Sequence, residues 1–442
     1  MSYDFSGIRA DLAADGPREV YADWLEEHGQ PERAEYIHLA VRLARRHPAD
    51  ADRNDLAKRV FALEKKHARA WTADLREHVM FATFDRGLVE QARITPKKLV
   101  SHAPRIFELA PVLHRVWSRD PLPRALVPEL AARPELRWLD SLALNEQRLG
   151  PPGVRSLLES PHLTGLRELS LRDDRVDDEA GGALASWPGL TALTSLSLGQ
   201  NPIGPAVLAQ VLANAPALTR LSASGLPLQL LPDSLRHAGL EHLDASWCTF
   251  DPGDWARLAT QFPGIRSLAF ENRPLERGHA AAIARVPWAL THLRMYQARF
   301  DDAAFTELLS GPWAALESFR AYANQLGDAG WAALGAHPWP RLREVFLDGL
   351  PSVAAGRSLH ALAPRLESLT LWGTTGTDAL NALLEVPWPR LHTLCVTASE
   401  ATVPALANRE HLPVLRSLDL RRSKITGPNL RILRREYGFG LR

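Results

Sequence analysis

The sequence predicts an α/β fold in which a curved parallel sheet lines the inside of a solenoid and short helices cover the outside. The first observation is an apolar register that recurs every 22 to 27 residues between Leu139 and Leu415. The second is the stretch of helical periodicity that separates one register from the next. The third is helical spacing without this register before residue 80, which predicts an N-terminal α-helical module.

Each of twelve registers carries an apolar residue, two variable residues, a second apolar residue, one variable residue and a third apolar residue. This pattern resembles the signature of leucine-rich repeats, which stack because each repeat buries its apolar face only against its neighbours. Every register predicts a short strand from its first to its third apolar residue. The first apolar residues are Leu139, Leu166, Leu193, Leu218, Leu240, Ile265, Leu290, Leu316, Leu342, Leu366, Leu391 and Leu415.

Ahead of the repeats, helical spacing predicts two short helices between Pro17 and His47 and a third over residues 54–78, with Asn54 or Asp52 as N-cap. Four motifs here resemble the bacterial repeat-companion domain and the segment that joins it to leucine-rich repeats. They are DGPR (15–18), YADWLEEHGQP (21–31), RAEYIHL (33–39) and FDRGLVE (84–90). The resemblance implies an architecture and carries no assigned chemistry.

We therefore expect three regions. Residues 1–80 form the helical repeat-companion module, and residues 134–442 form the leucine-rich-repeat domain of about twelve repeats. Residues 81–133 are a joining segment and a degenerate capping repeat, because Leu113, Val116 and Ser118 fall one repeat length before the first full register. A terminal repeat of this kind shields the apolar end of a stack.

Composition excludes several classes of function. The 52 basic and 51 acidic side chains nearly cancel, so extended nucleic-acid binding is not expected. No segment approaches the roughly 20 apolar residues that span a bilayer, and the first residues do not resemble a secretory signal, so we expect a cytoplasmic protein without membrane contact. The two cysteines, Cys248 and Cys395, are too far apart in repeat number for a disulfide framework, and they are too few to hold zinc.

The segments between strands contain two recurring features. Residues 301–309 are typical of a convex helix with an acidic N-cap, ended by Pro312. A Pro-Trp pair precedes several strands, and it indicates either a row of binding anchors or a packing spine. The constant phase of the pair favours packing. The tryptophans are Trp288, Trp313, Trp339 and Trp388.

Leucine-rich repeats usually place an asparagine three residues after the third apolar residue, where its amide satisfies backbone groups inside the turn. Asn201 and Asn324 follow this rule. Polar substitutes stand at Gln147, Asp174, Thr374, Ser399 and Ser423, but Leu226, Cys248, Arg273, Ala298 and Leu350 cannot replace the amide. We expect looser turns or compensating water at the latter positions, and a buried, non-nucleophilic Cys248.

Alternation within a strand places the variable residues of each register on the inner face of the sheet. Four consecutive strands carry large side chains there, whereas the early strands carry mainly serine, alanine and glycine. The large residues indicate a partner-binding surface, because Tyr, Trp and Arg dominate binding hot spots. The alternative is that Arg and Tyr only tile the sheet through cation–π contacts. The expected surface comprises Arg294, Tyr296, Arg320, Tyr322, Phe346, Asp348, Thr370 and Trp372, with Trp247, Glu271 and Asp244 as an extension.

No catalytic residues, metal or cofactors are expected. The Glu35-x-x-His38 pair occurs once, whereas a di-metal site of this type needs a second copy. The seven cations Arg416, Arg421, Arg422, Lys424, Arg431, Arg434 and Arg435 are typical of a solvated cap more than of an anion site.

The sequence thus favours a non-enzymatic scaffold that binds a protein partner of unknown identity. The alternatives are an enzyme regulator, either a GTPase activator that supplies an Arg or an inhibitor or immunity protein, and the substrate-recognition part of a ubiquitin-ligase-like effector.

Overall fold

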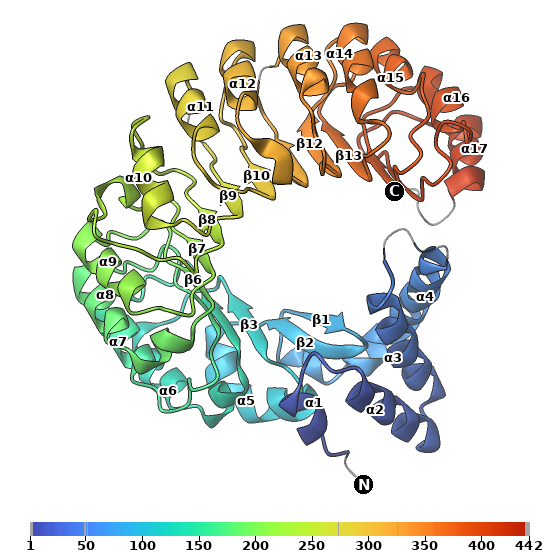
Figure 1. The fold of residues 1–442 in the computed structure, drawn as a ribbon. Helices are drawn as coiled ribbons and strands as arrows, with labels where there is room; N and C mark the ends of the chain where they lie inside the picture. The colour runs from blue at the N-terminus through green and yellow to red at the C-terminus, as the bar shows by residue number, and fades with distance from the viewer. Residues whose placement is uncertain (1–2, 48–49, 51, 273, 325, 438–442) are drawn as a thin grey trace. The chain divides into compact units, whose positions relative to one another are not determined.

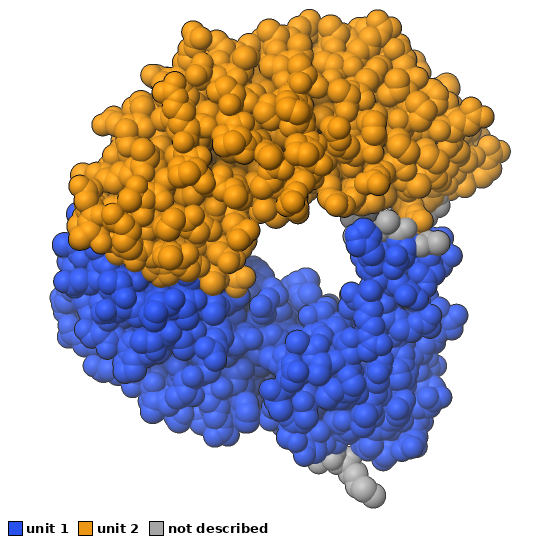
Figure 2. All heavy atoms as spheres, viewed as in Figure 1, with its two compact units in different colours: residues 1–218 blue, residues 219–442 orange. Residues whose placement is uncertain are grey.

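The computed structural model describes residues 3–47, 50, 52–272, 274–324 and 326–437 (Figure 1). Contacts divide the chain into two compact units, Met1–Leu218 and Thr219–Arg442, which Figure 2 colours separately. Both units alternate short parallel strands with helices, which confirms the predicted α/β leucine-rich-repeat solenoid with helices at its N-terminus. The boundary at Leu218 falls inside the repeats. The predicted region boundaries at residues 80 and 133 stay predictions.

Unit 1 begins with four helices, α1 (Ser6–Ala10), α2 (Gly16–Glu27), α3 (Pro31–Ala44) and α4 (Arg53–Trp71). The last helix is shorter than predicted. It ends where the Thr72 hydroxyl donates to the Ala68 carbonyl, and Leu75–Glu77 form a separate 3-10 turn. Of the two expected N-caps, Asp52 occupies the N-cap position and Asn54 lies inside the helix. The Asp52 side chain makes no cap hydrogen bond and pairs instead with Arg46 at 3.0 Å.

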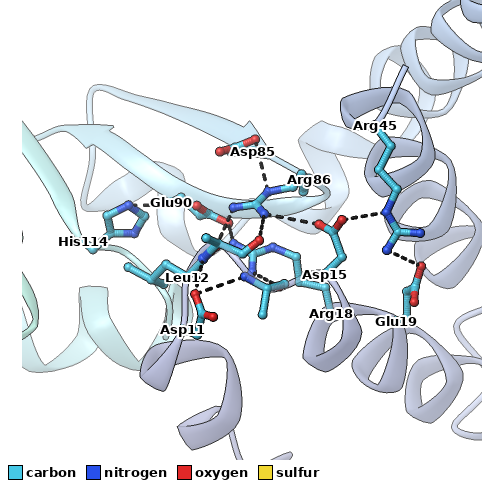
Figure 3. Close-up of polar contacts among 12 residues, drawn as sticks. Asp11, Leu12, Asp15, Arg18, Glu19, Arg45, Asp85, Arg86, Glu90 and His114 are labelled. Atoms are coloured by element: carbon cyan, nitrogen blue, oxygen red, sulfur yellow. Dashed lines mark hydrogen bonds and ion pairs between the residues drawn. The ribbon is translucent and has the colours of Figure 1, made fainter. Parts of the chain in front are cut away.

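A hairpin joins these helices to the sheet. Strands β1 (Phe81–Asp85) and β2 (Leu88–Arg93) are antiparallel, and the turn between them has left-handed backbone at Arg86 (φ 42°) and Gly87 (φ 88°). Gly87 is required, because a Cβ there would lie 2.7 Å from the Ile37 Cα of α3. The Arg86 guanidinium donates to the Ala13 carbonyl at 2.7 Å, which ties the turn to the segment between α1 and α2 (Figure 3).

A buried ion pair lies beside this hairpin. The Arg18 guanidinium of α2 donates to the Glu90 carboxylate of β2, and both side chains are nearly inaccessible (Figure 3). The His114 ring lies 4.0 Å from the Glu90 carboxylate and 3.7 Å from the Asp140 carboxylate. Burial raises the pKa of Glu90, although the Arg18 charge opposes that shift.

Beyond the hairpin, unit 1 stacks strands β2 to β6 in parallel and in chain order. The remaining elements are α5 (Pro96–Leu109), β3 (Arg115–Ser118), α6 (Val127–Ala131), β4 (Ser141–Leu144), α7 (Gly150–Leu158), β5 (Glu168–Ser170), α8 (Asp178–Ala185), β6 (Ser195–Ser197) and α9 (Pro205–Ala213).

Unit 2 repeats the same arrangement, with strands β7 to β15 parallel and in chain order. Its helices lie on one face of the strands and leave the inner face open (Figure 1). The elements are β7 (Arg220–Ser222), β8 (His242–Asp244), α10 (Asp254–Gln261), β9 (Ser267–Ala269), α11 (Arg277–Ala284), β10 (His292–Arg294), α12 (Asp302–Leu309), β11 (Ser318–Ala321), α13 (Asp328–Ala336), β12 (Glu344–Asp348), α14 (Val353–Ser358), β13 (Ser368–Trp372), α15 (Thr377–Leu383), β14 (Thr393–Cys395), α16 (Val403–Leu406), β15 (Ser417–Asp419) and α17 (Gly427–Tyr437).

The apolar register forms the core of both units. All three apolar residues of every register are buried, and none is more than 6% exposed. The repeat strands are shorter than predicted, because the first apolar residue closes the preceding turn and does not join the strand. The Leu193 N–H, for example, donates to the Leu190 carbonyl, and β6 starts two residues later.

The Pro-Trp pairs form a packing spine. Trp288, Trp313, Trp339 and Trp388 are at most 3% exposed, and each indole N–H donates to a backbone carbonyl at 2.8–3.1 Å. The structure therefore confirms the packing interpretation and leaves no binding anchor at this phase.

In nine of the twelve repeats, the turn after the strand contains a left-handed residue at the same phase, seven residues beyond the first apolar residue. The non-glycine residues there have φ between 54° and 65°, a conformation that costs an L-residue about 1 kcal/mol or more. They are Glu146, Asp173, Gln200, Trp247, Asn272, Gln297 and Ala323, and Gly225 and Gly373 occupy the same phase. Trp247 is the bulkiest of these and is 54% exposed.

The asparagine ladder is partly present. The Asn201 amide accepts from the N–H of Asp174 and donates to the Leu171 carbonyl, and the Asn324 amide donates to the Met295 carbonyl. Where asparagine is missing, the side chains of Leu226, Cys248, Ala298 and Leu350 are at most 1% exposed and pack against the core. The looser turns or compensating water expected there stay a prediction. The Cys248 thiol itself donates to the Ala223 carbonyl at 3.2 Å. Arg273 lies outside the described residues.

Candidate protein-binding surface

Four aromatic side chains form a continuous patch on the inner face of β10 to β13. Tyr296 follows β10, Tyr322 follows β11, Phe346 lies within β12 and Trp372 ends β13. The strand register places Phe346 opposite Arg320 of β11 and Trp372 opposite Asp348 of β12. We call Tyr296, Tyr322, Phe346 and Trp372 the aromatic patch.

The rings of the aromatic patch contact one another. Tyr322 meets Tyr296, Phe346 and Trp372 edge to face, with centroids 6.0, 5.8 and 5.8 Å apart. Phe346 lies 5.8 Å from Tyr296 and 6.0 Å from Trp372. All four side chains are half-buried, so each ring is held by its neighbours and still presents area to solvent.

Arginines flank the aromatic patch and are held in place by carboxylates. Arg294 pairs with Glu271 at 2.8 Å and lies 5.9 Å from the Tyr296 ring. Arg320 pairs with Glu344 at 2.5 Å. Both side chains stay more than 40% exposed, so each can still donate to a partner. Burial raises the pKa of Glu271, and Arg294 opposes that shift.

Two of the expected residues serve the fold. The Asp348 carboxylate accepts from the backbone N–H groups of Ala323 and Asn324 at 2.9 and 2.8 Å, so its oxygens hold a turn. Asp244 accepts from the Ser222 hydroxyl at 3.1 Å.

The expected extension through Trp247 and Glu271 connects to the patch by its backbone. The Trp247 N–H donates to the Glu271 carbonyl at 3.0 Å, and Glu271 in turn pairs with Arg294. Trp247 is exposed at the end of this series of contacts. The strained conformation of such a large side chain at an exposed position is not explained by packing.

Sequence reasoning missed Arg422 as part of this surface. Its guanidinium lies 3.5 Å from the centroid of the Trp372 ring, although it comes from the turn after β15. The alternation of side chains along a strand says nothing about a residue in a turn. The arginine-rich composition of the last repeat was the only sequence signal for Arg422. Glu344 was also missed, but its position two residues before Phe346 in the register could have shown that it neighbours Arg320.

The other candidate sites are occupied by structural contacts. Glu35 pairs with Arg59, and His38 lies 3.2 Å from Asp23. Burial and the nearby Asp419 raise the pKa of the Cys395 thiol, which opposes the thiolate that a nucleophile needs. Among the described residues, no group of three or more His, Cys, Asp or Glu is placed to hold a metal ion, and no helix could cross a bilayer.

Three solved structures share a remote likeness with this chain. No family model and no curated protein matches this chain. A chain of the yeast Rad7–Elc1 complex is 15% identical with a TM-score of 0.42, and the match covers 97% of this chain and 96% of that one. A chain of the Drosophila Toll–Spatzle complex is 15% identical with a TM-score of 0.31, over 80% and 44% of the two chains. A Bacteroides fragilis protein is 10% identical with a TM-score of 0.35, over 63% and 73%. The fold assignment depends on the strand order and register of this chain itself.

Proposed function

We propose that this protein is a non-enzymatic recognition scaffold that binds a protein partner on the inner face of β10 to β13. The observation that carries the proposal is the aromatic patch, in which Tyr322 and Phe346 each contact the other three rings and all four rings stay half-exposed on an open face. The contacts between the rings already restrict the rotamers of these side chains, which lowers the entropic cost of binding a partner to their exposed apolar area.

The composition of the surface supports a protein ligand. Binding hot spots combine Tyr, Trp and Arg at the centre with charged pairs at the rim. Here Arg294 and Arg320 lie beside the rings and are paired with Glu271 and Glu344, so the surface carries both signs of charge. A surface of mixed charge favours a protein over a polyanion, for which unpaired cations would be needed.

The competing proposal of a GTPase activator has less support at this surface. An activating arginine must reach into the partner's active site. Arg294 and Arg320 are each held by a carboxylate, and Arg422 lies over Trp372.

The test is affinity capture from the native cell followed by titration of the captured partner with purified variants. We expect Trp372→Ala and Tyr322→Ala each to weaken the partner by about 1–3 kcal/mol, because each removes ring area from the centre of the surface. Val353→Ala is the matched control, since Val353 is exposed on α14 on the opposite face. Unchanged affinity in both aromatic variants would exclude this surface, and faster GTP hydrolysis by a panel of nucleotide-loaded GTPases would favour the activator.

A further inference from the structure

A second candidate surface lies in unit 1, in a groove between α4 and β1. The groove has a volume of about 840 Å³, and both walls belong to the N-terminal region. On one side, α4 presents Phe61, Lys65, Ala68 and Arg69. Lys65 lies four residues after Phe61, three before Ala68 and four before Arg69, and these spacings place side chains on one face of a helix. On the other side is β1, preceded by Met80.

β1 is the end strand of its sheet. Its partner is β2, and among the described residues no strand pairs with its other edge. The strand is also accessible, since Phe81 is 59% exposed and the preceding Met80 is 55% exposed. An exposed apolar edge strand is a template for strand addition by another chain.

Phe84, which lines the groove, is held by aromatic neighbours that lie outside the lining. The Phe84 ring of β1 lies edge to face with Tyr36 of α3 and Trp71 of α4, with centroids 5.6 and 6.4 Å apart. The Arg33 guanidinium lies over both Trp71 and Phe84. These contacts fix the distance between helix and strand, so that the opening exists before a ligand arrives.

The charge of the groove selects an acidic occupant. Lys65, Arg69 and Arg76 line it, all three are exposed, and none has an ion-pair partner among the described residues. Glu64 is the only acidic residue in the described lining, and one of its oxygens already accepts from the Tyr36 hydroxyl at 3.0 Å. Unpaired cations beside an apolar wall favour carboxylate and apolar side chains together.

We propose that this groove binds an extended acidic segment of a partner protein, which adds to the open edge of β1 and lies against α4. The backbone of the segment pairs with β1, its apolar side chains contact Phe61, Met80 and Phe81, and its carboxylates pair with the three cations. A strand rises about 3.3 Å per residue, so β1 accommodates roughly five residues of such a segment. This surface is independent of the aromatic patch, and either can fail without the other.

The probe is a capped, fluorescein-labelled octapeptide that alternates glutamate and valine, titrated against the full chain by fluorescence anisotropy. We expect the Lys65→Glu, Arg69→Glu double variant to weaken binding at least tenfold. Lys66→Glu is the matched control, because Lys66 is exposed on the same helix but does not line the groove. It should bind like the unchanged protein. A peptide with N-methyl groups on alternate amides should lose binding to the same degree, since it cannot pair with a strand edge.

Three results would overturn the proposal. One is equal binding of a peptide with lysine in place of glutamate, which would remove the electrostatic basis. Another is full binding by the N-methylated peptide, which would exclude strand addition. The third is binding of a single-stranded oligonucleotide, lost in the double variant, without binding of the acidic peptide. That result would assign the cations to a nucleic-acid backbone.

Discussion

Asp174 occupies the turn position at which other repeats place Asn201 and Asn324. It is inaccessible to solvent, and its Oδ1 accepts from the Gln147 N–H at 2.7 Å. Its Oδ2 has no hydrogen-bond partner in the described part of the chain. In the next repeat, the side-chain nitrogen of Asn201 donates to backbone carbonyls. Burial raises the pKa of Asp174 to about 7, although the backbone N–H groups around it oppose this.

This shift gives unit 1 a pH-dependent stability. In the unfolded chain the carboxyl titrates near its ordinary pKa of 3.8, so between that value and about 7 the folded protein binds more protons than the unfolded chain. The free energy of unfolding from this group therefore falls as pH rises through that window. Below about pH 4 both states are protonated and the full contribution is present.

We expect Asp174→Asn to stabilise the protein at pH 8 by on the order of 1–3 kcal/mol, because the amide cannot ionise and its N–H₂ can donate where Oδ2 lacks a partner. Urea unfolding at pH 4.5 and pH 8 measures both this gain and the pH dependence, which should become smaller. Glu159→Gln, at an exposed carboxylate in the same unit, is the control. An unchanged difference between the two pH values would contradict the assigned pKa.

At the scale of single residues, the sequence predicted which side chains lie on the inner face, but it predicted poorly which groups those side chains contact. Alternation placed Tyr296, Tyr322, Phe346 and Trp372 on one face, where the structure brings them into contact. It could not show that the Asp348 carboxylate turns back to the backbone. Whether a polar side chain faces a ligand or satisfies a buried N–H depends on backbone groups in the next repeat, which spacing alone does not locate. The binding role of these residues stays a prediction.

At the scale of elements, two buried tryptophans close together in the chain differ in hydrogen bonding: Trp331 lies within α13 and Trp339 follows it. Both are at most 1% exposed. The Trp339 indole N–H donates to the Leu334 carbonyl at 2.8 Å, whereas the Trp331 indole N–H has no partner among the described residues. The two side chains therefore bury similar area and differ in hydrogen bonding.

We expect Trp339→Phe to destabilise the protein by about 1 kcal/mol more than Trp331→Phe. Both substitutions lose packing, but the first also removes a hydrogen bond from a buried carbonyl at the end of a helix. Urea unfolding followed by circular dichroism gives the difference between the two variants. Equal losses would show that the spine is held by packing alone.

The spacing of apolar residues was enough to predict that each repeat contains a strand. Every register yielded a buried strand because one phase of the repeat must face the core. Element ends were predicted less well. The sequence extended α4 to residue 78, but the helix ends at Trp71, next to Thr72, whose backbone N–H and hydroxyl both donate to the Ala68 carbonyl. The repeat strands begin late because a preceding turn takes the first N–H group.

At the scale of the whole molecule, the buried Arg18–Glu90 pair attaches the N-terminal helices to the sheet of unit 1. We expect Glu90→Gln to destabilise this region by about 3–5 kcal/mol, since it leaves the buried Arg18 charge without a counter-ion. Replacing both residues, as in Arg18→Met with Glu90→Leu, should recover most of that loss.

Hydrogen exchange followed by mass spectrometry checks where the loss appears. Repeats couple mainly to their nearest neighbours, so in Glu90→Gln we expect faster exchange around α2 and β1 to β3 and unchanged exchange in β10 to β13. Faster exchange in β10 to β13 would contradict the nearest-neighbour picture and imply one cooperative fold.

The left-handed turn residue recurs in nine of the twelve repeats, so a substitution that stabilises one of these turns can be repeated at the others. Asparagine adopts this geometry more readily than glutamate, glutamine or alanine, and Asn272 already does so in this chain. Gains from turns that share no contacts should add. Asparagine substitutions at successive turns could therefore raise the melting temperature of this chain stepwise for use as a capture reagent, without changing Trp247 or the aromatic patch.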